Sequence, residues 1–161
     1  MAGVAEAPPL PEDLGEVIRH LEAVWPHEGC GVLLRAGAEG PWRCRPLLNA
    51  LAPPASRRAY AFELREWLGV LREAEVRGER VMCVFHSHVE TGGGAGTGLS
   101  AEDRHQAAPG GEPLLPGVSY LVMALVAGRV QAAEVFAWEG GGYRGYPLQK
   151  APVDRQPMEI P

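Results

Sequence analysis

An uninterrupted apolar run from Val81 to Phe85 leads directly into the tripeptide His86-Ser87-His88. A compact run of this kind is typical of a buried strand, so the chain is predicted to fold around a sheet that contains it. Side chains two residues apart on a strand point to the same side, and the residue between them points to the other. We therefore expect His86 and His88 to present two imidazoles to one point, with Ser87 facing away.

The rest of the chain alternates between helical and extended patterns. Strand 118–126 is expected to pair antiparallel with 129–138 through the turn Ala127-Gly128. The order of elements suits an α/β sandwich with a mixed central sheet. Four apolar residues share one face of the second helix: Leu64, Trp67, Leu68 and Leu71. Helices are predicted over 13–25, 63–76 and 100–108, and strands over 31–34, 42–48, 60–62, 81–88, 118–126, 129–138 and 143–148.

The length of the chain suits one domain with one core. It has 161 residues, and an apolar fraction of 46% is enough to fill that core. Residues 1–11 are rich in Ala and Pro and are predicted to be disordered. Residues 149–161 contain three prolines and no regular pattern, which predicts a mobile tail. The folded domain is therefore expected to span residues 12–148.

Charge and hydropathy exclude several classes of partner. The net charge is −5 and the basic residues are scattered, which argues against nucleic acid. The sequence has neither a basic amphipathic helix nor an apolar run of about 18–20 residues, so no membrane contact is predicted. Residues 1–11 do not resemble a secretory signal, and we expect a cytoplasmic protein. The three cysteines lack regular spacing, which argues against a disulfide framework.

A second polar segment, Ser100 to Asp103, follows the histidines after a glycine-rich stretch. Asp103 is a candidate third metal ligand beside His86 and His88, which leaves one coordination position open. Three protein ligands plus water are typical of a catalytic rather than a structural zinc site. Imidazole and carboxylate donors favour Zn2+, although other divalent metals accept the same set.

Hydrolysis at such a site also needs a general base and a donor to the oxyanion. Glu28 is the candidate base, because it lies between small residues where the first helix ends and a strand begins. Ser100 is the candidate donor. Simpler interpretations stay open: a solvated acid for Glu28, a capping box for Ser100 and Asp103, and a surface or core pair for the two histidines.

Neither H-E-x-x-H nor the zinc deaminase signature is present in the chain. The combination of Glu28, His86-Ser87-His88 and the Ser-x-x-Asp of residues 100–103 instead resembles the JAMM (MPN-plus, Mov34/PAD-1) metalloprotease family. The chain is most similar to the bacterial single-domain type, and the similarity covers roughly residues 13–148. It extends to segments 26–34, 49–50, 60–62 and 119–122.

This resemblance implies a role for each residue of the pattern. His86, His88 and Asp103 resemble the zinc ligands, with water as the fourth. Glu28 resembles the base that activates this water, and Ser100 resembles the residue that helps to stabilise the oxyanion. The implied fold is an α/β sandwich with a curved mixed sheet flanked by helices, of the JAMM and cytidine-deaminase-like kind.

Two features depart from the family pattern. Eleven residues, 89–99, separate His88 from Ser100 where about seven are typical, and Val89 stands where a proline often follows. The surplus is rich in glycine. Extra loop length costs only about 0.6 kcal/mol per doubling, so Asp103 is still expected to reach the metal.

The resemblance implies a zinc metallopeptidase that hydrolyses peptide or isopeptide bonds after the C-terminus of a ubiquitin-like or sulfur-carrier protein. Two alternatives remain. The first is a non-catalytic binding module of the same fold, which the long glycine-rich loop favours. The second is a metal amidase that acts on a small molecule through the same site.

Overall fold

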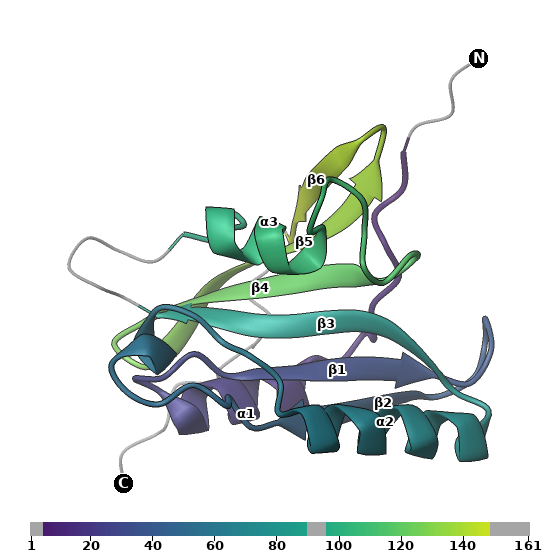
Figure 1. The fold of residues 1–161 in the computed structure, drawn as a ribbon, viewed down its shortest axis with the longest axis horizontal. Coiled ribbons are helices and arrows are strands. Elements are labelled where there is room, and N and C mark those ends of the chain that lie inside the picture. The colour runs from purple at the N-terminus through teal and green to yellow at the C-terminus, as the bar shows by residue number, and fades with distance from the viewer. Residues whose placement is uncertain (1–4, 90–95, 149–161) are drawn as a thin grey trace, which may run out of the picture.

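The computed structural model describes residues 5–89 and 96–148, which form a six-stranded sheet with three α-helices and one short 3-10 helix (Figure 1). The helices are α1 (Gly15–Val24), α2 (Leu64–Arg77) and α3 (Ala101–Ala107), with the 3-10 helix η1 at Ala55–Arg57. The strands are β1 (Cys30–Arg35), β2 (Trp42–Leu47), β3 (Arg80–Val89), β4 (Ser119–Val126), β5 (Arg129–Glu139) and β6 (Gly142–Pro147).

The predictions about the two ends of the chain concern residues that lie mostly outside the described ranges. The predicted mobile tail, 149–161, lies outside the described residues, as do residues 1–4 of the predicted disordered segment 1–11. Residues 5–11 form neither a helix nor a strand, and Leu10 packs against the core. No helix among the described residues combines the length and the apolar character needed to cross a bilayer.

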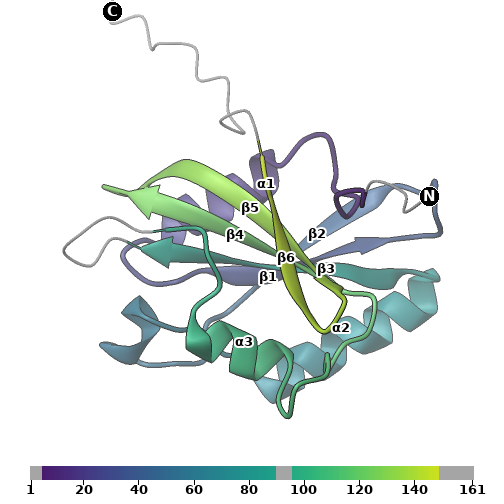
Figure 2. The ribbon, with the colours of Figure 1, turned by 90° about the horizontal axis from the view of Figure 1, so that it is seen from above.

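The sheet is mixed, with the strand order β2-β1-β3-β4-β5-β6. Strands β3 and β4 are parallel, and every other neighbouring pair is antiparallel. Parallel neighbours need a crossover connection, and here the crossover contains α3. Figure 2 shows α1 on one side of the sheet and α2 and α3 on the other. The α/β sandwich with a curved mixed sheet that the sequence predicts is therefore confirmed.

Alternation along β3 distributes its side chains between two cores. Cys83 and Phe85 pack with residues of α1 in one core. Val84 packs with residues of α2 and α3 in the other. Because the alternation continues, His86 faces the α3 side of the sheet and Ser87 faces the α1 side. Both histidine side chains therefore lie on the face of the sheet that α3 covers.

Helix α2 does not bury the apolar face that the sequence emphasises. It contacts the core through Val70 and Ala74, and Trp67 is only partly buried, stacked on Phe62. Helical spacing defines a face but does not determine which face meets the sheet, and the short side chains of Val70 and Ala74 allow a close approach here. The remaining members of the stripe are 68%, 43% and 42% exposed: Leu64, Leu68 and Leu71.

The predicted β4–β5 hairpin is confirmed, whereas the predicted edge strand 60–62 is not. Ala127 and Gly128 turn the hairpin with φ values of 50° and 78°, which is the left-handed backbone of a type I′ turn. Residues 60–62 form only an isolated bridge, between Phe62 and Asn49. The Ala61 N–H donates to the Asn49 side chain rather than to a neighbouring strand.

Candidate metal centre

Two histidines and an aspartate meet at the end of β3. The Nε2 atoms of His86 and His88 lie 3.2 Å apart. Asp103 Oδ2 lies 3.3 Å from the first of these nitrogens and 3.0 Å from the second. The His86 side chain is fully buried, and those of His88 and Asp103 are 14% and 9% exposed. The structure thus brings together the three residues that the sequence identifies as candidate ligands.

Asp103 is held in place by the first turn of α3. The Ser100 hydroxyl oxygen accepts a hydrogen bond from the Asp103 N–H at 3.0 Å, and Asp103 Oδ2 accepts one from the Ser100 N–H at 2.9 Å. This is a complete capping box. The capping interpretation is therefore confirmed, and it is compatible with a metal, because the same carboxylate oxygen also faces both imidazoles.

The orientation of the His88 ring is set by the end of the loop after β3. Nδ1 of His88 lies 2.7 Å from the carbonyl oxygen of Gly96. A carbonyl oxygen only accepts, so Nδ1 carries a hydrogen, and Nε2 is the ring nitrogen that faces Asp103. Metal-bound histidines are commonly held in this way by a backbone carbonyl. Of the glycine-rich stretch 89–99, residues 90–95 lie outside the described residues.

His86 is held by packing. Its ring stacks on Tyr60, with centroids 4.5 Å apart and an interplanar angle of 29°. Its Nδ1 atom is buried and has no hydrogen-bond partner in the described part of the chain. His86 therefore lacks the backbone tether that orients His88, and aromatic stacking fixes its ring instead.

The donor set fits a divalent cation. The Nε2 atoms of His86 and His88 and the Oδ2 atom of Asp103 lie within 3.3 Å of one another, and imidazole and carboxylate are ligands that divalent metals such as zinc accept. Glu28 adds another donor, since one atom each from Glu28, His86 and His88 lie within 4.8 Å of one another. Its Oε1 atom is buried and unpartnered within residues 5–89 and 96–148. Two ligand triads are thus available, and Asp103 lies the nearer of the two carboxylates to both imidazoles.

Glu28 lies between α1 and β1 and is only 4% exposed, so its interpretation as a solvated acid is wrong. Burial raises the pKa of Glu28 to about 8, which His88 opposes and the negative charges of Asp103 and Glu102 reinforce. A carboxyl group with a pKa near neutrality exchanges its proton readily at working pH. This environment gives Glu28 the proton affinity that a general base needs.

The pKa values of the other three groups, Asp103, His86 and His88, shift in different directions. Burial alone would raise the pKa of Asp103, but hydrogen bonds from His86 and His88 outweigh burial and hold this pKa well below its usual range. Burial lowers the pKa of His86. For His88, burial acts downward, but Asp103 and the Gly96 carbonyl outweigh it and raise the pKa. Asp103 is therefore a carboxylate at neutral pH, as a ligand must be.

The buried Glu28 carboxyl makes the metal-free protein sensitive to alkaline pH. Its pKa rises from 4.5 to about 8 on folding, so the stability linked to its protonated form is complete below about pH 4.5 and is lost as pH rises through about 8. We expect Glu28→Gln to abolish this loss, which amounts to about 4 kcal/mol between pH 5 and pH 9. Urea unfolding of both metal-free proteins near pH 5 and pH 9 measures it. If the free energies of unfolding of wild type and Glu28→Gln differ by the same amount at both pH values, Glu28 is not a buried neutral group.

Ser87 connects the histidine strand to the segment that carries Glu28. The Gly29 N–H donates to the Ser87 hydroxyl oxygen at 2.8 Å, and the Ser87 N–H donates to the Gly29 carbonyl at 3.0 Å. Ser87 faces away from the imidazoles, as predicted, but no sequence pattern linked it with Gly29. A signal was present, because a polar residue in a buried strand needs a hydrogen-bond partner. Nor did the sequence indicate the contacts of Tyr60 and Gly96.

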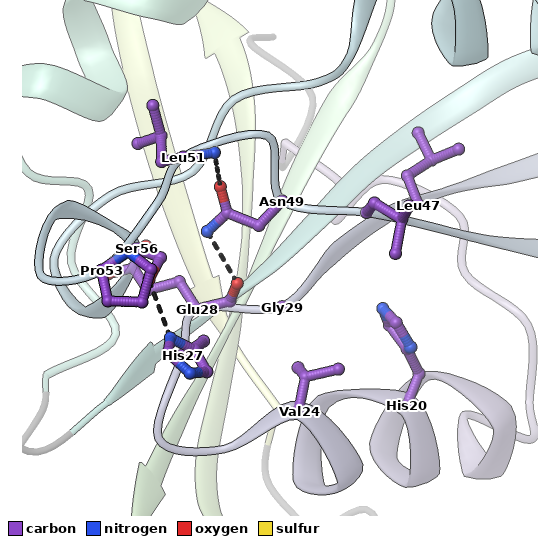
Figure 3. Close-up of a pocket in the computed structure, with 11 residues that line it drawn as sticks. His20, Val24, His27, Glu28, Gly29, Leu47, Asn49, Leu51, Pro53 and Ser56 are labelled. Atoms are coloured by element: carbon purple, nitrogen blue, oxygen red, sulfur yellow. Dashed lines mark hydrogen bonds between the residues drawn. The ribbon is translucent and has the colours of Figure 1, made fainter.

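A separate cavity of about 270 Å³ lies between α1 and the chain that follows β2 (Figure 3). Glu28 is part of its wall, and the three candidate ligands are not. His20 and His27 also line it. His20 Nε2 lies 3.0 Å from the Cys30 carbonyl oxygen, and His27 Nδ1 lies 2.7 Å from the Ser56 hydroxyl. Both rings are engaged in local hydrogen bonds at half-buried positions.

These features define an α/β domain with a candidate histidine–carboxylate metal centre at the end of its parallel strand pair. The chain belongs to the prokaryotic homologs of the JAB domain, whose family model matches residues 11–140. This match confirms the resemblance to the JAMM and MPN-plus group.

Solved structures agree with the fold. The solution structure of a protein from Desulfitobacterium hafniense is 24% identical, with a TM-score of 0.63 over 84% of this chain and 86% of that one. A protein from Salinibacter ruber, also solved in solution, is 24% identical, with a TM-score of 0.50 over 91% and 90% of the two chains. At this identity the two structures show the fold alone. No curated protein matches the sequence.

Proposed function

We propose that this protein is a zinc-dependent metallopeptidase that hydrolyses peptide or isopeptide bonds. One observation carries the proposal: two imidazoles and Asp103 converge within 3.3 Å beside a buried Glu28 whose pKa is raised to about 8. Metal ligands alone would suit a structural site. Hydrolysis also requires a proton acceptor next to the ligands, and Glu28, whose pKa lies near neutral pH, supplies it.

Each residue then has a distinct task. His86, His88 and Asp103 would hold the ion, which when bound supplies Lewis acidity and lowers the pKa of a water to about 7. Glu28 takes up a proton on its carboxylate and returns it to the departing amine. The Ser100 hydroxyl oxygen is already an acceptor in the capping box, so its hydrogen remains to be donated to the developing oxyanion.

The proposed substrate is the C-terminal tail of a ubiquitin-like or sulfur-carrier protein in the cytoplasm. This part of the proposal rests on the family resemblance and on an apolar cleft of about 160 Å³ on the same side of the sheet. Its apolar lining includes Phe62, Trp67, Leu114 and Leu115. Tyr60 also lines it and stacks on His86, which connects the cleft with the candidate metal centre. Such a cleft suits the apolar side chains of an extended peptide.

The proposal is tested with a ubiquitin-like protein fused through its C-terminus to a reporter peptide. We expect zinc to raise the melting temperature of the purified protein and to permit cleavage at the junction, and a chelator to abolish both effects. Zinc binding with hydrolysis of small amides only would favour the amidase. Failure to bind zinc, with no cleavage of either substrate, would favour the non-catalytic binding module.

A further inference from the structure

The Asn49 side chain satisfies every one of its hydrogen-bonding positions. Its Nδ2 atom donates to the carbonyl oxygens of Glu28 and Ala59, both at 3.0 Å. Its Oδ1 atom accepts from the N–H groups of Leu51 at 3.0 Å and Ala61 at 3.3 Å. Figure 3 shows two of these bonds, to Glu28 and to Leu51. One amide thus joins the segment before β1, the segment after β2 and the segment before α2.

This set of contacts requires an amide. The two carbonyl oxygens need donors and the two N–H groups need acceptors, and a planar carboxamide offers both. Aspartate has nearly the same shape, but its carboxylate would place an acceptor against the Glu28 and Ala59 carbonyls. Replacing Asn49 by aspartate therefore removes the donors while the acceptor for Leu51 and Ala61 stays.

Two hydrogen bonds hold the main chain of Glu28, and Asn49 makes one of them. The Glu28 N–H donates to the Ser56 carbonyl at 2.7 Å, and the Glu28 carbonyl accepts from Asn49. By contrast, Oε1 of its own carboxyl group has no partner within the described ranges. The position of the Glu28 carboxyl group is therefore set mainly through its main chain, and Asn49 supplies the only side-chain bond to that main chain within those ranges.

We propose that Asn49 is a positioning residue, which holds the Glu28 main chain so that the Glu28 carboxyl group faces the imidazoles of His86 and His88. This inference rests on the proposed function, because it assumes that Glu28 moves the proton. It adds a specific residue that acts through Glu28 without contacting substrate or metal. A displacement of about 1 Å in a reacting group can cost about 100-fold in rate, so a loosened Glu28 has a measurable consequence.

The experiment compares Asn49→Asp with Glu66→Ala in the full chain. Glu66 accepts the Leu48 N–H at 2.7 Å, so its removal loosens the neighbouring residue without touching Glu28. For Asn49→Asp we expect kcat on the fusion substrate to fall by about 10- to 100-fold, with KM and zinc content within about twofold of wild type. Glu66→Ala should leave kcat within about twofold. If Asn49→Asp does not fold, Asn49→Ala introduces no charge and carries the same expectation.

Amide hydrogen exchange supplies a readout that needs neither substrate nor metal. In Asn49→Asp, the amides of Glu28 and Gly29 should exchange at least about 10-fold faster, while amides in the centre of β3 keep their protection. In Glu66→Ala, only the Leu48 amide should accelerate. An unchanged kcat, an equal loss in Glu66→Ala, or uniform loss of protection across the sheet would overturn the positioning role.

The two proposals fail separately. A wild-type protein that cleaves no fusion overturns the proposed function, and with it any role of Asn49 in catalysis. Hydrogen exchange would still decide whether Asn49 holds Glu28. A wild-type protein that cleaves the fusion, together with an active Asn49→Asp variant, overturns the positioning inference alone.

Discussion

Replacing Glu28 by glutamine is expected to lower kcat by about 100- to 10,000-fold while the protein keeps its bound zinc. Glutamine has nearly the same size and stays neutral, so it cannot take up the proton that a carboxylate accepts. Burial already favours the neutral form of this side chain, as the pKa of about 8 indicates. The variant should therefore fold at least as well as wild type. Steady-state kinetics on the fusion substrate, with zinc content measured on the same samples, checks the prediction.

Glu102→Gln is the matched control for this experiment. Glu102 is an exposed acid in the first turn of α3, and it contributes to the electrostatic field at Glu28 without belonging to the candidate site. We expect its kcat to stay within about threefold of wild type, since an exposed charge is well screened. Full activity in Glu28→Gln would remove Glu28 from the mechanism, whatever the control shows.

Replacing Asp103 by asparagine is expected to weaken zinc binding by more than about 100-fold, since loss of an outer-shell partner alone costs about 10- to 100-fold. The substitution removes the negative charge that lies 3.0 and 3.3 Å from the two imidazole nitrogens. An amide is a poor substitute for a carboxylate at a divalent ion. Competition with a chromogenic chelator measures the affinity, and activity should fall in parallel.

His105→Ala provides the control for the loss of zinc. His105 is exposed on the same short helix, two residues beyond Asp103, and should leave zinc affinity unchanged. Retention of zinc by Asp103→Asn would support the other available triad, Glu28 with the two histidines. That outcome would make Glu28 a ligand rather than a base.

The candidate site was predictable to the extent that its residues lie in local motifs. The two-residue period of a strand places His86 and His88 on one side, and the Ser-x-x-Asp spacing predicts the capping box at the start of α3. Both hold in the structure. Glu28 belongs to no local pattern that requires it near the histidines, so its choice as the base rested on its place between small residues at the start of a strand and on the family resemblance.

Local patterns did not predict which face of a helix is buried or which segment a predicted strand pairs with. The leucines of α2 share a face but remain exposed, because Val70 and Ala74 meet the core instead. Residues 60–62 have strand-like composition, yet the Asn49 side chain takes the hydrogen bond that a neighbouring strand would otherwise accept. In both cases the deciding contact comes from a distant part of the chain.

By itself, the sequence determined the properties that short-range backbone geometry governs. These are the alternation along β3, the capped start of α3 and the type of residue available as a ligand. Only the tertiary structure decided that Glu28 is buried beside the histidines, that the Gly96 carbonyl orients His88 and that Asn49 holds the Glu28 main chain. Burial and hydrogen bonding between distant segments depend on how the sheet and helices pack. The proton affinity of Glu28 follows from that packing, because its desolvation arises only when the chain is folded.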